Sequence, residues 1–324
     1  MGLSSRSLSL FFWPLRLLAL AARALLSLTR GIRGWRFRPS ALRGCVLWLR
    51  PESGIASTWS LVTRWADRRR GVALVARAPT DCPSFVAQST ALHERPALRF
   101  DEGGGMLESP GTMAMSSLEG QLSVFLVLSP NQPWARMWAA HLRAVSGPRS
   151  GARRSPNEAA QRPRVRVLTW LGGSRSVGIE LDGHNEVLAV IDEGLVRASG
   201  VRLMAGLPYL VGLIVTGDTA AVIVNGARVD TFAVDRELTG AFTARLRLGS
   251  GRRLRERFSG DVGDVLVYDR ALDALECAAV AATLTRRYDI GGPRRRRTID
   301  RFRRILHRLR DRLADACYGS PRAS

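Results

Sequence analysis

The most informative pattern in the chain lies between residues 258 and 290, where an alternating segment runs directly into a helical one. Residues 258–268 read FSGDVGDVLVY, and the apolar side chains of Val262, Val265 and Val267 predict a strand. The residues that follow, up to Ile290, carry apolar side chains at helical spacing and predict an amphipathic helix. We expect this strand and this helix to close a folded domain that begins upstream.

The middle of the chain predicts a series of short strands. They are expected at 45–50, 58–67, 96–100, 121–129, 165–171, 176–181, 186–191, 207–216, 220–225, 228–234, 243–248 and 258–268. Residues 121–129, QLSVFLVLS, are almost wholly apolar, as in a strand that is covered on both faces. Gly217-Asp218-Thr219 joins two of the strands as a hairpin turn. Many short strands with Gly, Asn and Asp turns and little helix predict an all-β fold, a sandwich or jelly roll.

Five short motifs follow one another between residues 45 and 290. They are LWLRPESGI at 47–55, VTRWAD at 62–67, RPALRFD at 95–101, VNG at 224–226 and the closing strand and helix at 260–288. Their order resembles that of the laminin-G-like, concanavalin A-like jelly-roll family, although Arg50 and Pro51 depart from the opening motif of that family. The resemblance implies an antiparallel β-sandwich jelly roll over 45–290. It also implies a lectin-like role, in which the domain binds a carbohydrate or protein ligand without catalysis.

The net charge of +21 is unevenly distributed along the chain. All 49 basic residues are Arg, which we attribute to GC-rich coding rather than to chemistry. Residues 1–50 carry nine Arg and no acid, and residues 294–324 carry a net charge of +8, which leaves +4 for the 243 residues between them. The body of the protein is therefore close to neutral, and any attraction to nucleic acid or anionic lipid belongs to the two ends.

Residues 1–40 predict a basic, apolar N-terminal helical arm. Residues 8–28 read LSLFFWPLRLLALAARALLSL, an apolar run of roughly membrane-span length that Arg16 and Arg23 interrupt. Arg16, Arg23 and Arg30 recur every seven residues on one helical face, opposite a leucine-rich face. This pattern favours a helix that lies in a membrane interface. A signal or inserted segment and a partner-binding segment are the alternatives.

Residues 293–324 predict an Arg-rich amphipathic helix and tail. Apolar residues from Ile299 to Leu313 recur at spacings of three or four, and the Arg cluster at 294–312 occupies the other faces. The helix is expected to pack on the N-terminal arm, to lie on an anionic membrane surface or to pair with another subunit, and a solvated basic tail is a further option. Nucleic acid is a disfavoured partner because no dedicated nucleic-acid-binding motif is present.

The tryptophans divide into two groups by their setting in the sequence. Residues 132–164 lack strand alternation and predict a long surface loop, with Trp134 and Trp138 near its start. We name these two as candidate ligand-binding residues, because an exposed indole offers a flat apolar platform for a sugar ring. Trp59 and Trp65 are alternatives for the same stacking role, but both lie within a predicted strand, so we favour a core position for each of them.

Asp182, His184 and Asn185 are further candidate ligand-binding residues, and all three lie in one predicted hairpin turn. Glu180, Asp182 and Glu186 faintly resemble the paired carboxylates of glycosidases that share this sandwich. The turn, however, places Glu186 on the returning strand, which makes the spacing too long. We therefore expect a solvated hairpin tip and keep glycoside hydrolysis as the weaker alternative.

Metal and disulfide chemistry are weakly supported by the sequence. No His or Cys residues have zinc-ligand spacing, so no cofactor is expected, with calcium left open. Asp182, Asn185, Asp218 and Asn225 carry the side-chain oxygens that calcium prefers, although turns favour Asp and Asn for conformational reasons alone. Cys45, Cys82, Cys277 and Cys317 are widely separated. A Cys45–Cys82 bridge is one option, and four free thiols match the spacing better.

No Walker loop, dinucleotide fingerprint or G-x-S-x-G motif is present, so the sequence favours a protein without catalytic activity. We expect a lectin-like binding or adhesion module that its arms hold at a membrane or assembly surface, at the cell surface or associated with a membrane. The alternative is a structural subunit of a virion or other particle, whose arms contact neighbouring subunits.

Overall fold

The structure of the chain is a computed structural model, which describes residues 37–101, 105–114, 121–131, 164–172, 175–191, 195–234, 243–250 and 257–291. The chain divides into two units, residues 1–41 and 42–324. The described part of the first unit contains the short 3-10 turn η2 (Pro39–Ala41). The helical arms expected at 1–40 and 293–324 lie outside the described residues, apart from residues 37–40, and stay predictions.

The second unit is dominated by β-strands. Its strands are β1 (Cys45–Leu49), β2 (Ile55–Thr58), β3 (Leu61–Ala66), β4 (Ala73–Val75), β5 (Ser84–Ser89), β6 (Arg95–Phe100), β7 (Leu107–Glu108), β8 (Met113–Ala114), β9 (Gln121–Pro130), β10 (Arg164–Gly172), β11 (Arg175–Asp182), β12 (Glu186–Ile191), β13 (Leu195–Arg202), β14 (Tyr209–Thr216), β15 (Thr219–Val224), β16 (Ala227–Ala233), β17 (Thr243–Leu248) and β18 (Gly260–Tyr268). The other elements are the 3-10 turns η3 (Pro79–Asp81) and η4 (Thr90–Leu92) and the helix α3 (Ala274–Arg287). No helix in the described residues combines the length and the apolar character needed to cross a bilayer.

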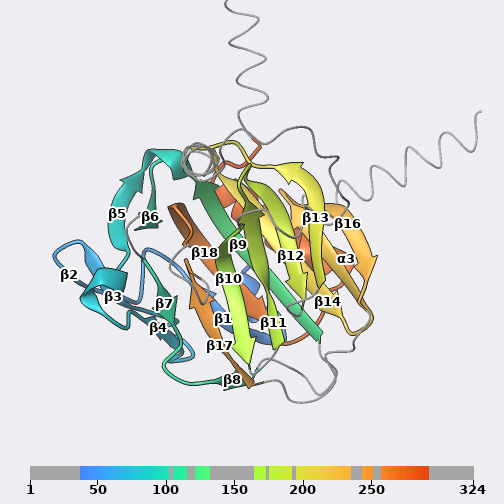
Figure 1. Cartoon of the computed structure of the whole chain (residues 1–324), viewed down its shortest axis with the longest axis horizontal. Helices are drawn as coiled ribbons and strands as arrows, with labels where there is room; N and C mark the ends of the chain where they lie inside the picture. Colours follow the sequence, from blue (N-terminus) through green and yellow to red (C-terminus); the bar gives the residue numbers. More distant parts are fainter. Residues whose placement is uncertain are drawn as a thin grey trace, which may run out of the picture. The chain divides into compact units, whose positions relative to one another are not determined.

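The strands pair antiparallel and form two packed layers (Figure 1). The first sheet has the order β1, β18, β9, β14, β15, β16. The second sheet has the order β13, β12, β11, β10, β17, β7, β4, β3, β2. Strands β5 and β6 connect the two sheets, because β5 pairs with β3 and with β6, and β6 pairs with β18. The predicted antiparallel β-sandwich is confirmed.

The hydrophobic core fills the space between the two sheets. In β9, alternate residues from Leu122 to Leu128 belong to this core. The other face of β9 is covered as well, since Phe125 is fully buried and packs edge-on against Tyr268, with ring centroids 6.4 Å apart. The expectation that residues 121–129 form a strand covered on both faces is confirmed.

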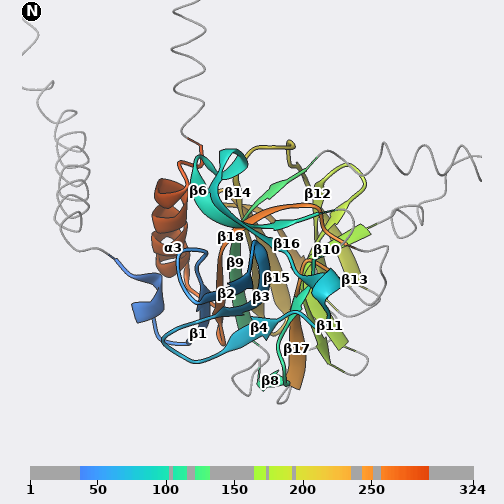
Figure 2. The same ribbon diagram turned by 90° about the vertical axis from the view of Figure 1, so that its left-hand side faces the viewer.

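Helix α3 lies against the outer face of the first sheet (Figure 2). Its buried side chains are Cys277, Val280, Ala281 and Leu284. A Cβ added at Gly263 in β18 would come within 2.7 Å of the Tyr288 ring, so this glycine lets the end of the helix approach the strand. The helix begins with a capping box, in which Asp273 and Glu276 each accept a hydrogen bond from the other's backbone N–H. The closing strand and helix predicted from the sequence are confirmed.

A buried polar network joins the end of α3 to β18 and β1. The Tyr288 hydroxyl donates to Asp264 Oδ1 (2.7 Å) and accepts from the Asp264 backbone N–H (3.0 Å). Trp48 Nε1 donates to Asp264 Oδ2 (3.0 Å), and Arg287 Nε lies 3.4 Å from Asp264 Oδ1. Burial raises the pKa of Asp264, and the Arg287 charge and the two side-chain hydrogen bonds oppose this effect only in part.

The strand expected at 58–67 is instead a hairpin. Thr58 pairs with Leu61, so the chain reverses at residues 59 and 60, and β2 and β3 run on either side. This correction separates the two tryptophans. Trp65 is fully buried, as expected, and its Nε1 donates to the Arg50 carbonyl (3.1 Å), whereas Trp59 is 94% exposed. The expectation of a core position was wrong for Trp59, because the turn takes its side chain away from the sheet.

Candidate functional site

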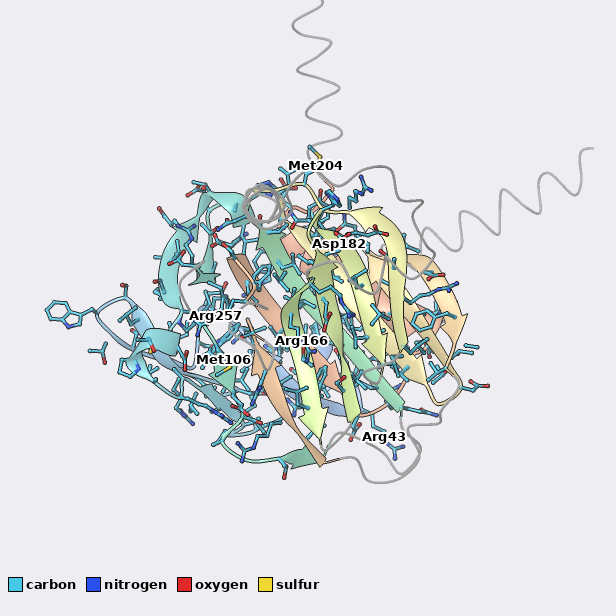
Figure 3. All side chains as sticks on the ribbon, viewed as in Figure 1. Arg43, Met106, Arg166, Asp182, Met204 and Arg257 are labelled. Atoms are coloured by element: carbon cyan, nitrogen blue, oxygen red, sulfur yellow. The ribbon has the colours of Figure 1, made fainter. Side chains whose placement is uncertain are left out.

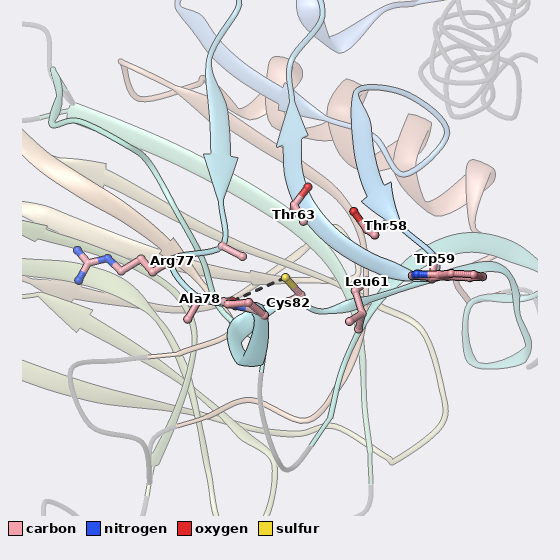
Figure 4. Close-up of a pocket in the computed structure, with 9 residues that line it drawn as sticks. Thr58, Trp59, Leu61, Thr63, Arg77, Ala78 and Cys82 are labelled. Carbon is pink, nitrogen blue, oxygen red and sulfur yellow. Dashed lines mark hydrogen bonds between the residues drawn. The ribbon is translucent and has the colours of Figure 1, made fainter.

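Trp59 stands at the edge of an open cavity of about 380 Å³ beside the β2–β3 hairpin (Figure 4). The cavity is lined by Thr58, Trp59, Leu61, Thr63, Ala76, Arg77, Ala78, Pro79 and Cys82. Four large hydrophobic side chains are exposed in the described parts of the chain, and two of them, Trp59 and Leu61, lie here. We call these nine residues the Trp59 cavity.

The backbone at Trp59 adopts a conformation that is rare for a bulky residue. Its φ of 60° is left-handed, which costs of order 1–3 kcal/mol outside glycine. Residues 83–85 of the same chain hold this turn in place. The Val62 N–H donates to the Pro83 carbonyl and the Phe85 N–H donates to the Ser60 carbonyl, both at 2.7 Å. Strained backbone conformations that the surrounding structure imposes in this way cluster at ligand-binding sites in proteins.

The floor of the Trp59 cavity is apolar and its margins are polar. Cys82 Sγ donates to the Ala78 carbonyl (3.7 Å), and partial burial raises the pKa of this thiol, with the Asp81 charge acting in the same direction. The thiol therefore stays neutral and adds to the apolar lining. Thr63 Oγ1 donates to the Ala56 carbonyl (3.2 Å), and Arg77 lies at the end of the lining opposite Trp59 (Figure 4).

A second cavity, of about 500 Å³, lies where η4 meets the end of α3. It is lined by Thr90, His93, Glu94, Arg95, Arg286, Arg287, Tyr288 and Asp289. His93 Nδ1 lies 2.9 Å from the Tyr288 carbonyl, so this ring nitrogen carries the proton. Four of the six non-glycine residues with positive φ in the described residues line one of the two cavities, and the other two are asparagines in hairpin turns. Four of these six strained positions therefore coincide with the two cavities.

The three candidates in the β11–β12 turn do not form an open site. Asp182 and Asn185 are buried, and His184 is exposed. Asp182 Oδ1 accepts from the backbone N–H groups of His184 and Glu186, each at 2.8 Å, and Asn185 Nδ2 donates to the Asn131 carbonyl (3.3 Å). Figure 3 shows Asp182 at one end of its sheet, with Arg166 further along the layer. The expected solvated tip is wrong for Asp182 and Asn185, because both side chains complete the hydrogen bonding of backbone groups.

The carboxylates considered for hydrolysis have structural contacts. Glu180 is 2% exposed and forms ion pairs with Arg166 (3.0 Å) and Arg164 (3.7 Å). Glu186 Oε1 accepts from the Gly200 N–H (3.0 Å). Each carboxylate is therefore held by a neighbour in the sheet.

The four possible calcium ligands do not come together. Asp218 and Asn225 lie at opposite ends of β15, about 20 Å apart for a strand of this length. Asn225 Oδ1 accepts from the Leu210 N–H (3.0 Å), so the side chain already serves its turn. In the parts of the chain that the structure describes, no three His, Cys, Asp or Glu side chains are placed to hold a metal ion.

The remaining predicted residues are placed as follows. Trp134 and Trp138 lie outside the described residues. Cys45, Cys82 and Cys277 are free thiols, so the optional Cys45–Cys82 bridge is absent from the described structure. Sequence reasoning named Trp59 as a possible sugar-stacking residue but favoured a core position for it, because its turn contains no Gly, Asn, Asp or Pro and reads as part of a strand. The available signal was the polar run Ser57-Thr58 before it and Ser60 after it, which interrupts the apolar alternation.

Comparisons with known proteins give similar folds and no family. No model of a protein family matches the chain, and no curated protein does. The binding domain of Paraclostridial Mosquitocidal Protein 1 is 10% identical, with a TM-score of 0.50 over 74% of this chain and 52% of that one. A domain of an extracellular arabinanase from Geobacillus stearothermophilus, solved with arabinotriose, is 12% identical, with a TM-score of 0.47 over 73% of this chain and 98% of the domain.

A sialidase from Trypanosoma rangeli, solved with sialic acid, is 15% identical, with a TM-score of 0.47 over 74% of this chain. The chain spans about a third of the length of the sialidases that it matches (33%). At these identities the comparisons bear on the β-sandwich fold alone.

Proposed function

We propose that this protein is a non-catalytic carbohydrate-binding module and that the Trp59 cavity holds the sugar. The observation that carries the proposal is the indole of Trp59, which is 94% exposed in a strained turn above an apolar floor. A pyranose ring has apolar C–H faces and polar edges. It can stack on the indole while its hydroxyl groups reach the polar margins formed by Thr63 and Arg77.

The free energy of burying the Trp59 indole supports the view that a ligand covers this side chain. Burying an aromatic side chain of this size gains roughly 1.5–3 kcal/mol, and a stacked ring contributes about 0.5–1.5 kcal/mol beyond the buried area. The free protein forgoes this burial and also bears the strain of the left-handed turn. A sugar that covers the indole recovers the burial term at the moment of binding.

We infer that the sandwich belongs to the laminin-G-like, concanavalin A-like jelly rolls. The support is that the motif residues hold the opening strands together. The Trp48 N–H donates to Asp67 Oδ2 (3.0 Å), and Trp65 Nε1 donates to the Arg50 carbonyl (3.1 Å). Residues of the VTRWAD motif therefore bond to the LWLR segment, so the two motifs act together in the folded domain.

Binding is preferred to hydrolysis because of the environment of the acidic residues. A glycosidase requires two carboxyl groups that face the same substrate, one as acid and one as nucleophile or base. Glu180, Asp182 and Glu186 instead contact arginine and backbone groups. We keep the proposed location, at the cell surface or on a membrane through the terminal arms, as part of the same proposal, with assembly into a particle as the alternative.

The test compares two variants that each remove one exposed apolar side chain. Glycan-array screening of the full chain identifies a saccharide, and titration calorimetry then measures its affinity for Trp59→Ala and Leu275→Ala. Leu275 is the matched control because it is 82% exposed on α3. We expect Trp59→Ala to weaken binding at least about tenfold and Leu275→Ala to leave it unchanged. Failure of the full chain to bind any saccharide, or equal binding by the two variants, would contradict the proposal.

A further inference from the structure

One buried carboxylate on the outer face of the second sheet is surrounded by more positive charge than it requires. Glu108 is 1% exposed. Its carboxylate contacts the guanidinium of Arg77 and lies 3.2 Å from Arg247 Nε and 3.7 Å from Arg245 Nη1. One anion therefore faces three cations. We call Glu108 and the arginines around it the Glu108 cluster.

The strand register adds a fourth arginine to the same face. Arg64 pairs with Val75, Val75 pairs with Glu108, and Glu108 pairs with Arg247, so their side chains form one row across the sheet. The acidic residue nearest the cavity along the chain, Asp81, already forms an ion pair with Arg257 (3.4 Å). The Glu108 cluster thus carries a net charge of about +3, from four arginines and one glutamate.

Two of these arginines have donors to spare. Arg77 and Arg245 each keep 47% of the side chain exposed. Arg77 contacts Glu108 through Nε, and a guanidinium has five N–H donors, so about four of them remain for another acceptor. Arg245 lies beyond hydrogen-bonding distance of Glu108. Both groups are held in place by the buried carboxylate and still point donors toward solvent.

Arg77 belongs both to the Trp59 cavity and to the Glu108 cluster. Its side chain lines the Trp59 cavity, and in Figure 4 it extends away from Trp59 at the far end of the lining. A ligand that covers the indole and runs along the cavity floor therefore meets Arg77 next, and the rest of the Glu108 cluster beyond it. Guanidinium groups bind carboxylate and sulfate oxygens by charge-assisted hydrogen bonds, often two at a time.

We propose that the ligand of this protein is an acidic oligosaccharide, with a sugar ring stacked on Trp59 and its carboxylate or sulfate groups bound by Arg77 and Arg245. This inference rests on the proposed function and adds the charge of the ligand to it. Glu108 acts as a positioning residue, because it orients the guanidinium groups without contacting the saccharide.

The experiment measures affinities of the full chain for four probes at physiological salt. The probes are a heparin hexasaccharide, an oligogalacturonate hexamer, neutral maltohexaose and a single-stranded DNA oligonucleotide. The first two separate sulfate from carboxylate as the source of the charge.

The variants are Arg77→Gln, Arg245→Gln and Trp59→Ala. Arg197→Gln is the matched control, because Arg197 is exposed, forms one ion pair with Asp230 (3.6 Å) and lies on β13 at the opposite edge of the second sheet. The terminal arms are the same in every variant and cancel in the comparison.

We expect at least one acidic saccharide to bind more tightly than maltohexaose. Arg77→Gln weakens acidic binding about tenfold and Arg245→Gln several-fold, whereas Arg197→Gln changes it less than about twofold. Arg77→Lys recovers part of the loss because it keeps the charge. Trp59→Ala weakens the binding of the same saccharide, and each variant is checked for an unchanged melting temperature.

The inference is overturned if the glutamine variants lose no more affinity than Arg197→Gln. It is also overturned if maltohexaose binds as tightly as the acidic probes, or if DNA competes with the same dependence on Arg77 and Trp59. Binding of maltohexaose that depends on Trp59 and not on Arg77 would leave the proposed function standing and remove only the acidic ligand. Absence of binding to every saccharide would instead remove the proposed function itself.

Discussion

The β2–β3 hairpin and the junction between α3 and β18 depart from the usual distribution of polar and apolar residues in opposite ways. The hairpin exposes an indole in a strained conformation. The junction buries Asp264 completely, and it provides partners for that charge from Trp48, Arg287 and Tyr288. The buried Asp264 carboxylate has polar partners within the protein, whereas the indole of Trp59 stays exposed to solvent. This contrast indicates that the contacts of the junction serve stability, and it supports our proposal that the exposed indole of the hairpin binds a ligand.

The largest effect should follow from breaking the junction. Asp264→Ala leaves Trp48 Nε1 and the Tyr288 hydroxyl without their acceptor and Arg287 without its buried partner. We expect a loss of about 3–5 kcal/mol in the free energy of unfolding, measured by urea denaturation. Asp230→Ala, which breaks the exposed pair with Arg197, is the control and should cost less than about 1 kcal/mol. Equal losses in the two variants would show that the junction does not hold the helix.

A smaller effect sharpens the contrast between two hairpin turns. Asp182→Ala removes the acceptor of two backbone N–H groups in the β11–β12 turn. We expect a loss of about 1–3 kcal/mol in the free energy of unfolding and no change in saccharide affinity. Thermal unfolding and calorimetry on the same preparation check both values. A loss of affinity with unchanged stability would reverse the roles assigned to the two turns.

Trp59→Gly should stabilise the protein slightly. Glycine adopts positive φ without a steric cost, so the variant relieves the strain at the hairpin tip. We expect a gain of about 0.5–1 kcal/mol and a melting temperature higher by roughly 1–4 °C, together with the loss of saccharide binding. Ser60→Gly, whose backbone does not have positive φ, is the control and should not stabilise. A destabilised Trp59→Gly variant would mean that the indole supports the fold.

The pH dependence of stability tests the junction, because the buried Asp264 carboxyl titrates there. Burial raises the pKa of Asp264 above its unfolded value of about 3.9. The folded state therefore binds this proton more readily, so the contribution of Asp264 favours folding below about pH 3.9 and is lost as the pH rises through the folded pKa. The stability of the wild type relative to Asp264→Asn should fall as the pH increases from 4, measured by urea denaturation. A difference that rises with pH would mean that the partners of Asp264 outweigh its burial.

Much of the fold could be predicted because burial repeats locally along the chain. The apolar run at 121–129 predicts the doubly covered β9, and the segment at 258–290 predicts β18 and α3. The site could not be predicted in the same way. Trp59 sits in a run that reads as one strand, and its turn is imposed by hydrogen bonds from residues 83–85 rather than by its own residues.

Contacts between distant segments decided the remaining questions. Glu108 meets Arg245 and Arg247 more than 130 residues away, so the sequence gives no sign that these charges form one cluster. Asp182 and Asn185 have the residue types of a ligand site, and only their buried hydrogen bonds show that they serve the turn.

The sequence by itself determined the two-sheet architecture and its closing helix, because strand and helix periodicities depend on neighbouring residues. The tertiary structure alone decided which tryptophan is exposed and which carboxylates have partners. The reason is that exposure and pairing depend on residues brought together by the folded sheets, and no local pattern records them.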